Sequence, residues 1–471
     1  MLREDYEVVI GLEVHAELST KTKIFCSCPT EFGGEPNTHC CPVCMAMPGA
    51  LPVLNKKVVE YAIKAGLATN CSITRVSKND RKNYFYPDLS KAYQISQLVH
   101  PICLGGKVVL DSGKEMKLNR IHLEEDAGKL IHISKAEGTL IDYNRGGTPL
   151  IEIVTEPVFE SAEEVDEFLR KVRETLVFAD IADCKMEQGG MRCDVNLSLK
   201  PKGSKILGTR TEMKNLNSFK SVSRAICYEI ERQKEVLSHG GVVYQETRKW
   251  DDALGENFTM RSKEETQDYR YFPDPDILPF DITEEDKERI AKEIPTLPHE
   301  RRRKYVLEYG ISKKDSEHLT ESKHVSDYFE KCVSYFNCPK KISNWILTDL
   351  FRMVKDSESP IFPISEKDLA TIVKMTEEGK ITKTNGLVLM EKVVETKEEP
   401  EVLAKELNLL SSITEADIVK ILEKFKTENP KAVEDFKKDP KVMSFIIGYV
   451  MKNTQGKANG TVVRDLISKM F

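Results

Sequence analysis

The stretch VIGLEVHAEL, residues 9–18, alternates between apolar and polar positions with a period of two. This alternation predicts a β-strand with two different faces, because successive side chains of a strand point to opposite sides. Ile10, Leu12 and Val14 belong to the apolar face, whereas Glu13 and His15 share the other. Neighbours on one face lie about 6.5 Å apart, close enough to converge on one ion. A solvated sheet face would show the same alternation, so this stretch alone leaves both interpretations open.

Other segments repeat the pattern of acids and cations on one face of a strand. RCDVNLSL, TRTEMKN, PLIEIVTEP and HLEEDAGK supply these side chains: Arg192, Asp194, Asn196, Arg210, Glu212, Lys214, Glu152, Glu156, Glu124, Glu125 and Asp126. Repetition across separate segments favours a carboxylate-lined Mg²⁺ site over a merely solvated face. Mg²⁺ usually binds only one or two protein carboxylates together with phosphates and water, so not all of these acids can be ligands.

Helical periodicity interrupts the strands at two places and dominates the last third of the chain. Residues 161–178 repeat apolar positions at helical spacing, and Ser161 with Glu164 predicts a capping box at the start of that helix. A second helix is expected at about 221–237. After residue 282 short helices with charged faces replace the strands. The sequence therefore predicts an α+β chain with three domains, at residues 1–292, 293–400 and 401–471.

Composition is that of an ordinary soluble protein, with 40% hydrophobic and 31% charged residues in a chain of 471. No apolar run approaches the roughly 20 residues of a membrane span, and no hydrophobic segment follows the first charges. We therefore expect a cytoplasmic protein without membrane contact. The net charge of −6 argues against general adhesion to nucleic acid. The stretch from residue 440 nevertheless has five cations against one acid, which fits either a local RNA-contacting patch or a basic helix face.

The cysteine spacing between residues 26 and 44 predicts a metal centre. Cys26 and Cys28 form a C-x-C pair, and Cys41 and Cys44 form a C-x₂-C pair after twelve intervening residues. Two close thiol pairs joined by a turn-rich loop suit tetrahedral zinc, and four protein ligands leave no position for a reactive water, so the zinc would be structural. Reduced, buried cysteines are the alternative. His39 and Cys40 are spare ligands, so the sequence does not decide which residue is the fourth ligand.

Aromatic and basic residues alternate in two stretches, residues 80–96 and 268–280. Side chains such as Lys82 and Tyr84 can hold phosphates and stack on bases, although turn-flanking aromatics that cover a core edge have the same composition. The chain has no G-x-x-x-x-G-K-[ST] motif, so a bound nucleotide is not held by a P-loop. It also lacks G-x-S-x-G and a glycine- and serine-rich S-x-x-K tract, which argues against a self-contained amidase.

Nine strings together resemble one protein family in order and spacing, over essentially the full length. They are VIGLEVHAEL, CPVC, DRKNYFYPDLSKAYQISQ, HLEEDAGK, NRGGTPLIEIVTEP, MRCDVNLSL, EMKNLNSF, DYRYFPDPD and GYVMKNTQGKAN. The family is that of the B subunits of the aspartyl/glutamyl-tRNA amidotransferases. The resemblance implies a cradle related to glutamine synthetase, built on a large mixed or antiparallel sheet, then a helical domain and a small helical tail that contacts tRNA. It also implies two partners of the same complex, the A subunit, which is a glutaminase, and the small C subunit.

The resemblance implies ATP- and Mg²⁺-dependent phosphorylation of the side-chain carboxylate of Glu-tRNA(Gln), Asp-tRNA(Asn) or both, followed by amidation with ammonia from the glutaminase. The expected Mg²⁺ ligands are Glu13, His15, Glu125 and Glu152, with Asp194 and Glu212 as further catalytic residues. The expected ATP-contacting residues are Arg192, Arg210, Lys214, Asn217, Tyr84 and Lys82, of which Lys214 and Asn217, with Glu212, are also candidates for the mouth of an ammonia passage. A non-catalytic tRNA-binding scaffold of the same complex is the alternative. A stand-alone zinc hydrolase fits poorly, because the cysteines fill all four zinc positions.

Overall fold

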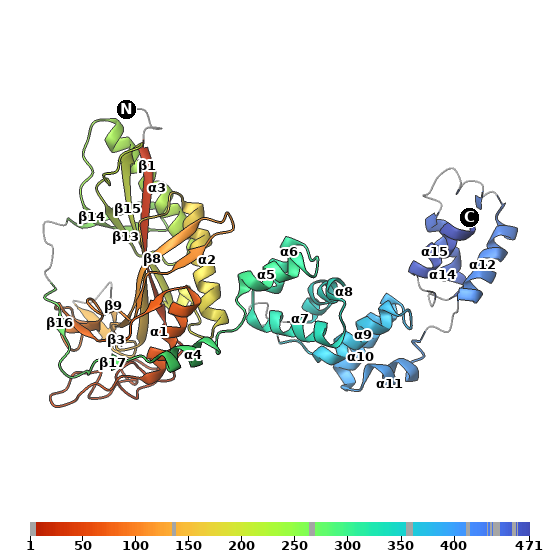
Figure 1. The fold of residues 1–471 in the computed structure, drawn as a ribbon, viewed down its shortest axis with the longest axis horizontal. Coiled ribbons are helices and arrows are strands. Elements are labelled where there is room, and N and C mark those ends of the chain that lie inside the picture. Colours follow the sequence, from red (N-terminus) through yellow and green to blue (C-terminus); the bar gives the residue numbers. More distant parts are fainter. Residues whose placement is uncertain are drawn as a thin grey trace. The chain divides into compact units, whose positions relative to one another are not determined.

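The computed structural model describes residues 6–133, 138–262, 269–354, 361–410, 415–430, 432–433, 436, 443–454, 458 and 460–471. The chain forms two compact units, Met1–Leu297 and Pro298–Phe471. The first unit is built around a large sheet, and the described part of the second consists of helices and their connections (Figure 1). Lys441 and Lys457 of the basic tail lie outside the described residues.

The first unit contains a ten-stranded sheet whose long central strands carry the site. In spatial order its strands are β15 (Glu256–Ser262), β14 (Glu246–Asp251), β13 (Thr211–Lys214), β12 (Met191–Pro201), β1 (Tyr6–Glu17), β11 (Pro149–Thr155), β8 (Glu115–Glu125), β6 (Cys103–Leu104) and β2 (Ser72–Ile73), and β7 (Lys107–Val109) pairs with β8. The β13–β14 pair is parallel and the other pairs are antiparallel, so the sheet is mixed. The predicted α+β class is confirmed.

The predicted alternation of the first strand is confirmed by its burial. Ile10, Leu12 and Val14 are fully enclosed in the core. Three helices supply the other half of this core, α1 (Lys56–Ala68), α2 (Ala162–Phe178) and α3 (Phe219–Ser238), and α4 (Glu284–Ala291) packs on α1. Because these helices cover the apolar face, the polar face of the central strands is left for chemistry.

The two predicted helices of the first unit are present, with one correction at each start. The Ser161 hydroxyl accepts a hydrogen bond from the Glu164 amide, as a capping box requires. The Glu164 carboxylate, however, accepts from the Glu160 amide at 2.9 Å rather than from the cap residue, so the reciprocal half of the box is wrong. The helix expected from residue 221 begins at Phe219, because the Ser218 hydroxyl accepts from the Ser221 amide and caps it.

Strand register aligns the polar side chains of the sheet into a row. His15 on β1 lies opposite Arg192 on β12 and opposite Glu152 on β11, and Glu152 in turn lies opposite His122 on β8. Directly opposed residues have β-carbons about 4.5–5.5 Å apart. Residues separated by more than a hundred positions in the sequence are therefore brought within contact distance.

Short sheets and a turn-rich loop complete the first unit. Their strands are β4 (Asp80–Asn83), β5 (Tyr93–Ser96) and β16 (Phe272–Pro273) in one sheet, β3 (Val76–Ser77) with β17 (Phe280–Asp281), and β9 (Lys129–His132) with β10 (Thr139–Asp142). The Arg81 guanidinium joins β4 to the segment after β16, through Asp274 at 2.7 Å and Asp276 at 2.8 Å. The two aromatic stretches of the sequence are thus tied together beside the sheet.

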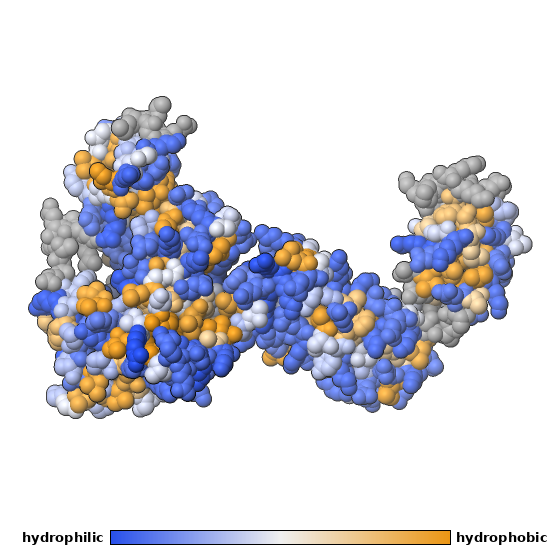
Figure 2. Space-filling view, viewed as in Figure 1, coloured by the Kyte–Doolittle hydropathy of each residue, from blue (hydrophilic) through white to orange (hydrophobic). Residues whose placement is uncertain are grey.

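The second unit has two apolar cores in its described part. The helices are α5 (Pro298–Leu307), α6 (Lys313–Leu319), α7 (Lys323–Tyr335), α8 (Pro339–Asn344), α9 (Glu366–Glu377), α10 (Lys383–Thr396), α11 (Pro400–Glu406), α12 (Glu415–Glu428), α14 (Met443–Asn453) and α15 (Gly460–Met470). Buried residues from Tyr305 to Ala404 form one core and those from Ile418 to Ile467 form another. Hydrophilic residues dominate the visible surface of this unit (Figure 2). None of the described helices is long and apolar enough to cross a membrane.

Candidate active site and metal centres

A cavity of about 540 Å³ lies over the polar face of the central strands. It collects most of the residues predicted from the sequence, from β1, β11, β12, β13 and the β4 region. They are Glu13, His15, Glu152, Asp194, Glu212, Arg192, Lys214, Lys82 and Tyr84. A sheet face that carries so many acids and cations inside one cavity is unlike a merely solvated face, whose charges point apart into water.

His15, Glu124 and Glu152 form a group that can hold a metal ion. Their ligand atoms lie within 4.8 Å of one another, and His15 Nε2 lies 3.4 Å from Glu152 Oε2. Oxygen and nitrogen atoms bound to one octahedral Mg²⁺ lie about 3–4 Å apart. Small side-chain adjustments would therefore bring all three donors to a shared cation, and the donor set fits a hard divalent ion.

His122 orients the two carboxylates of this group. Its Nε2 atom lies 3.3 Å from Glu124 Oε1 and 3.3 Å from Glu152 Oε2, and the ring is buried. Burial lowers the pKa of His122, but the hydrogen bonds and charges of Glu124 and Glu152 outweigh burial and raise it to about 9. Burial also opposes ionisation of Glu152, yet His122 and His15 hold the pKa of that carboxyl well below its usual range. The carboxylates therefore stay charged and available to a cation.

A second group, Glu13, Asp194 and Glu212, lies beside the first on the same face, again with donor atoms within 4.8 Å of one another. Burial raises the pKa of Glu13, and the carboxylates of Glu152 and Asp194 raise it further. The Lys214 ammonium contacts Asp194 and lies 3.1 Å from Glu212 Oε1. A divalent cation would relieve the part of this shift that comes from repulsion between carboxylates, so the second group is a further candidate cation position.

Glu125 does not join the expected ligand group, and Glu124 takes the place proposed for it. Ile121 and Leu123 are buried in the core, and the period of two places Glu125 on their side of β8. The Glu125 carboxylate is paired there with the Lys91 ammonium and accepts a hydrogen bond from the Ile95 amide at 2.9 Å. Ile121 and Leu123 already indicated which residues of β8 face the core. The run of three consecutive acids, Glu124 to Asp126, made this alternation hard to recognise.

Two of the expected ATP-contacting residues lie outside the cavity. Arg210 and Asn217 are exposed and do not line it. β13 ends at Lys214, and Asn215 has a positive φ of 67°, so the chain turns away before Asn217. His122, Gln94 and Arg120 also line the cavity and were not predicted from the sequence. Glu124 and Asp126, named among the acids, and Tyr269 and Tyr271, from the second aromatic stretch, line it as well, although none of them was expected as a metal ligand or an ATP contact. The period of two along β8 places Arg120, His122 and Glu124 on one face, so this pattern could have identified them.

Aromatic rings surround a lysine at one end of the cavity. The Lys82 ammonium lies 4.9 Å from the ring centre of Tyr269 and 5.8 Å from that of Tyr84. Tyr269 also packs edge-on against Tyr84 and Tyr271. Burial lowers the pKa of Lys82, but the interactions with Glu124 and with the neighbouring tyrosines together outweigh burial and raise it, so the ammonium stays charged. This end of the cavity can bind an anion against a cation held by aromatic faces.

The four predicted cysteines come together in the loop between β1 and α1. The sulfurs of Cys26, Cys28, Cys41 and Cys44 lie within 4.8 Å of one another, with 4.0 Å between Cys28 and Cys44 and 3.9 Å between Cys41 and Cys44. Thiolates at about 2.3 Å from a tetrahedral zinc lie about 3.8 Å apart. The spacing therefore fits a four-sulfur metal centre and is too long for a disulfide bond.

His39 and Cys40 are not part of the four-sulfur group. The Cys40 sulfur and the His39 amide both contact the side-chain oxygen of Asn144, at 4.0 Å and 2.8 Å. Within the centre, the hydrogen bond from Cys26 lowers the pKa of Cys44, and the Cys41 amide and the Lys23 charge lower it further. The sulfur of Cys44 is thus the one that its surroundings most favour as a thiolate.

A charged cavity with two carboxylate groups on a mixed sheet is typical of enzymes that handle phosphate with divalent cations. A family model described as the GatB/GatE catalytic domain matches residues 8–288, and one described as the GatB domain matches residues 327–471. The chain belongs to the B-subunit family of the aspartyl/glutamyl-tRNA(Asn/Gln) amidotransferases. It is 52% identical to the family member from Caldicellulosiruptor bescii, over 98% of both chains, and 49% identical to that from Thermoanaerobacter pseudethanolicus, over 98% of this chain and 99% of the other.

Proposed function

We propose that this chain converts Glu-tRNA(Gln), Asp-tRNA(Asn) or both to the amidated forms, using ATP and Mg²⁺ and ammonia from a glutaminase partner. The observation that carries the proposal is the pair of adjoining carboxylate groups, His15 with Glu124 and Glu152, and Glu13 with Asp194 and Glu212, inside one cavity. The relatives carry the name of one component of such an amidotransferase, which supports the substrate class.

Activation of the substrate explains why the cavity needs cations but no nucleophilic side chain of the protein. A free side-chain carboxylate has a pKa of about 4.3 and is ionised at neutral pH. Ammonia cannot expel an oxide from it, so the carboxylate must first be converted into an acyl phosphate, from which ammonia can displace phosphate. Because the attacking oxygen is already deprotonated, phosphoryl transfer depends on positioning and charge neutralisation rather than on a strong base.

The residues of the cavity divide these tasks between them. Glu124 and Glu152, aligned by His122, would hold Mg²⁺ together with His15, and Glu13, Asp194 and Glu212 would hold a second cation. Bound Mg²⁺ supplies charge neutralisation on the transferred phosphate. Lys214 contacts the second group and would have to move for a cation to bind there. Its ammonium would then be available to the phosphates of ATP.

Two cations that line the cavity are suited to the anionic substrate. Arg192 pairs with Asp126 at 2.6 Å, and Lys82 is held among tyrosine rings. We assign both cations to the phosphates of ATP or of the aminoacylated RNA end, with Tyr84 available for stacking. Glu212 and Lys214 lie in the cavity and remain candidates for receiving ammonia. Arg210 and Asn217 are not included, since they lie outside it.

The four-cysteine centre is proposed to bind a structural zinc ion. All four positions are protein sulfurs, so the centre stabilises the loop between β1 and α1 and takes no part in phosphoryl transfer. Because this loop follows directly after the strand that carries Glu13 and His15, an ordered loop helps to fix the end of that strand. Zinc would then act on the reaction only through the geometry of the cavity.

Three functional parts fit the proposal. The catalytic part, proposed for residues 1–292, corresponds to the sheet and its core, and the helical part to the core that begins at Tyr305. Leu403 and Ala404 belong to the core that begins at Tyr305. We therefore place the boundary with the tail after α11 rather than at residue 400. The tail, with Lys452, Arg464 and Lys469 among its described residues, is the proposed tRNA-contacting part.

An amidation assay tests the proposal and separates it from the scaffold alternative. The full chain is incubated with Glu-tRNA(Gln) or Asp-tRNA(Asn), ATP, Mg²⁺ and an ammonium salt, without glutamine or any partner protein. Formation of Gln-tRNA or Asn-tRNA that depends on ATP supports catalysis by this chain. Binding of the tRNA without any amidation or ATP consumption, with both appearing only when the glutaminase partner is added, would identify a scaffold.

A further inference from the structure

Lys23 is the most deeply buried lysine of the described part of the chain, with no exposed surface. It follows β1 by six residues and enters the loop that holds the cysteine centre. Moving an ammonium group out of water is costly unless an anion or several acceptors compensate for it. The partners of Lys23 must therefore account for its burial.

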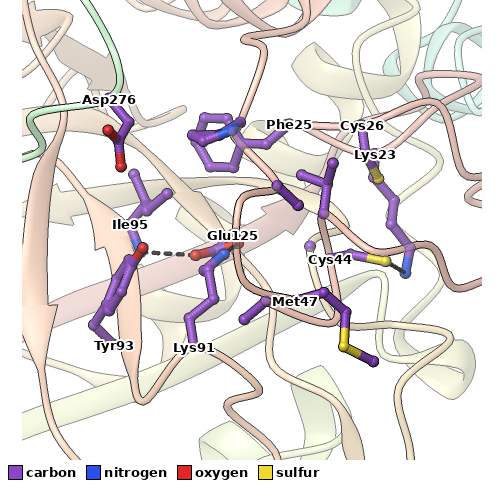
Figure 3. A pocket seen from close by; sticks show the side chains of 15 residues that line it. Lys23, Phe25, Cys26, Cys44, Met47, Lys91, Tyr93, Ile95, Glu125 and Asp276 are labelled. Carbon is purple, nitrogen blue, oxygen red and sulfur yellow. Dashed lines mark hydrogen bonds and ion pairs between the residues drawn. The ribbon is translucent and has the colours of Figure 1, made fainter.

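The contacts of Lys23 lead to the cysteine centre. Its ammonium lies 3.2 Å from the carbonyl oxygen of Tyr143, to which it donates, and 3.8 Å from the sulfur of Cys44 (Figure 3). A carbonyl and a sulfur are the hydrogen-bond partners of this ammonium among the described residues. The carbonyl carries no net charge, so the sulfur is the partner that can compensate for the ammonium.

The acids near Lys23 are occupied by other cations. Glu125 and Asp276 line the same cavity of about 220 Å³ as Lys23 and Cys44. Glu125 is paired with Lys91, and Asp276 is paired with Arg81. Neither acid is left over for Lys23. The negative charge that this lysine needs must come from thiolate sulfur, and four thiolates on one zinc ion leave a net charge of −2.

We propose that Lys23 is an outer-sphere partner of a zinc–thiolate centre, donating an N–H···S hydrogen bond to Cys44 and neutralising part of the centre's negative charge. The inference rests on the zinc assignment made above and adds the residue that sets the strength of that site. Groups that hydrogen-bond to metal ligands hold them in position, and their loss typically costs 10- to 100-fold in metal affinity. Lys23 is a positioning residue, since it acts on the metal through Cys44.

Zinc affinity of the full chain, measured by competition with a chromophoric chelator, tests the proposal. Lys23→Met keeps the length and the packing of the stem but removes the charge, and we expect it to bind zinc 10- to 100-fold more weakly than the parent. Lys21→Met is the matched control, because Lys21 is exposed and two residues away, and it should bind zinc like the parent. Lys23→Arg keeps the charge and should retain most of the affinity.

Cobalt substitution adds a readout that a purely structural role would not move. A hydrogen bond to a thiolate lowers its donor strength, so in Lys23→Met the sulfur-to-cobalt charge-transfer band should shift to longer wavelength, and in Lys23→Arg it should stay near the parent position. Should Lys23→Met fail to fold, Lys23→Gln, which keeps a donor and loses the charge, is compared with Lys23→Arg in the same two measurements.

The outcomes separate this inference from the zinc assignment. A parent chain that binds neither zinc nor cobalt at the cysteines overturns both. A parent that binds zinc, together with a folded Lys23→Met or Lys23→Gln variant of equal affinity and unshifted cobalt band, overturns the role of Lys23 alone. Weaker zinc binding together with the band shift, absent in Lys21→Met, supports it.

Discussion

The cysteine centre and the carboxylate cavity are two candidate metal sites in one unit, and they are assembled in opposite ways. Four sulfurs from residues 26–44 fill one centre completely. The cavity has a volume of about 540 Å³, draws His15, Glu124 and Glu152 from three strands, and keeps acids and cations side by side. A closed local site stabilises a loop, whereas an open site from distant strands can bind a substrate. The proposed function accordingly gives the first a structural role and the second a catalytic one.

The largest expected effect separates the two sites at Glu152. Glu152→Gln keeps the size of the side chain but removes the carboxylate that both His15 and His122 contact. We expect ATP-dependent amidation to fall about 10³-fold, equivalent to about 4 kcal/mol of transition-state stabilisation. Zinc content, measured by metal analysis of the same sample, should not change. Loss of zinc together with activity would show that the two sites are not independent.

The reverse experiment removes one sulfur. Cys41→Ser should lose zinc and lower the free energy of unfolding by about 3 kcal/mol or more, because metal binding contributes to folding. The rate of amidation per folded molecule should stay within a few-fold of the parent. Cys40→Ser is the matched control, since Cys40 lies outside the four-sulfur group. Equal zinc content in Cys41→Ser and Cys40→Ser would remove Cys41 from the centre.

The free energy of unfolding should depend on pH through His122, which lines the cavity. The folded-state pKa of about 9 lies above the unfolded value of about 6.5, so protonated His122 stabilises the fold fully below pH 6.5, and this stabilisation is lost as the pH rises through about 9. The full effect is about 3 kcal/mol. Denaturant unfolding of the Mg²⁺-free chain between pH 6 and 10 measures it, and His122→Gln should flatten the curve. An equally steep curve in the variant would assign the dependence elsewhere.

Glu124 and Glu125 are adjacent in the sequence, and comparing their variants tests which of the two faces the cavity. Glu124→Gln should raise the Mg²⁺ concentration needed for half-maximal ATP consumption about 30-fold, because Glu124 faces His15 and Glu152. Glu125→Gln should leave that requirement within about twofold, because Glu125 is paired with Lys91 on the other side of β8. The opposite ranking of the two variants would mean that β8 takes the other phase in the working enzyme.

The smallest effect is expected outside the cavity. Arg210→Ala should change the KM for ATP by less than about twofold, since Arg210 is exposed and does not line the cavity. Lys214→Ala, which removes a cation from inside, should raise that KM by at least about tenfold. Similar KM values for both variants would extend the nucleotide site beyond this cavity.

The contrast between a local site and a site built from distant strands also explains which features could be predicted from the sequence. The cysteine group, the two faces of β1 and the helices α2 and α3 follow from local spacing, and all of them were predictable. The phase of β8 was decided by Ile121 and Leu123, which place Glu124 rather than Glu125 in the cavity. Tyr269 and Tyr271 reach the site through pairing between segments nearly two hundred residues apart, and spacing along the chain does not encode that pairing.

Anomalous scattering from crystals of the full chain can locate both metals and the nucleotide in one experiment. Crystals are soaked with Mn²⁺ in place of Mg²⁺ and a non-hydrolysable ATP analogue, and data are collected at the manganese and zinc absorption edges. The account predicts manganese between His15, Glu124 and Glu152 with the triphosphate beside it, and zinc at the four cysteines alone. Nucleotide and manganese bound elsewhere, with this cavity empty, would contradict it.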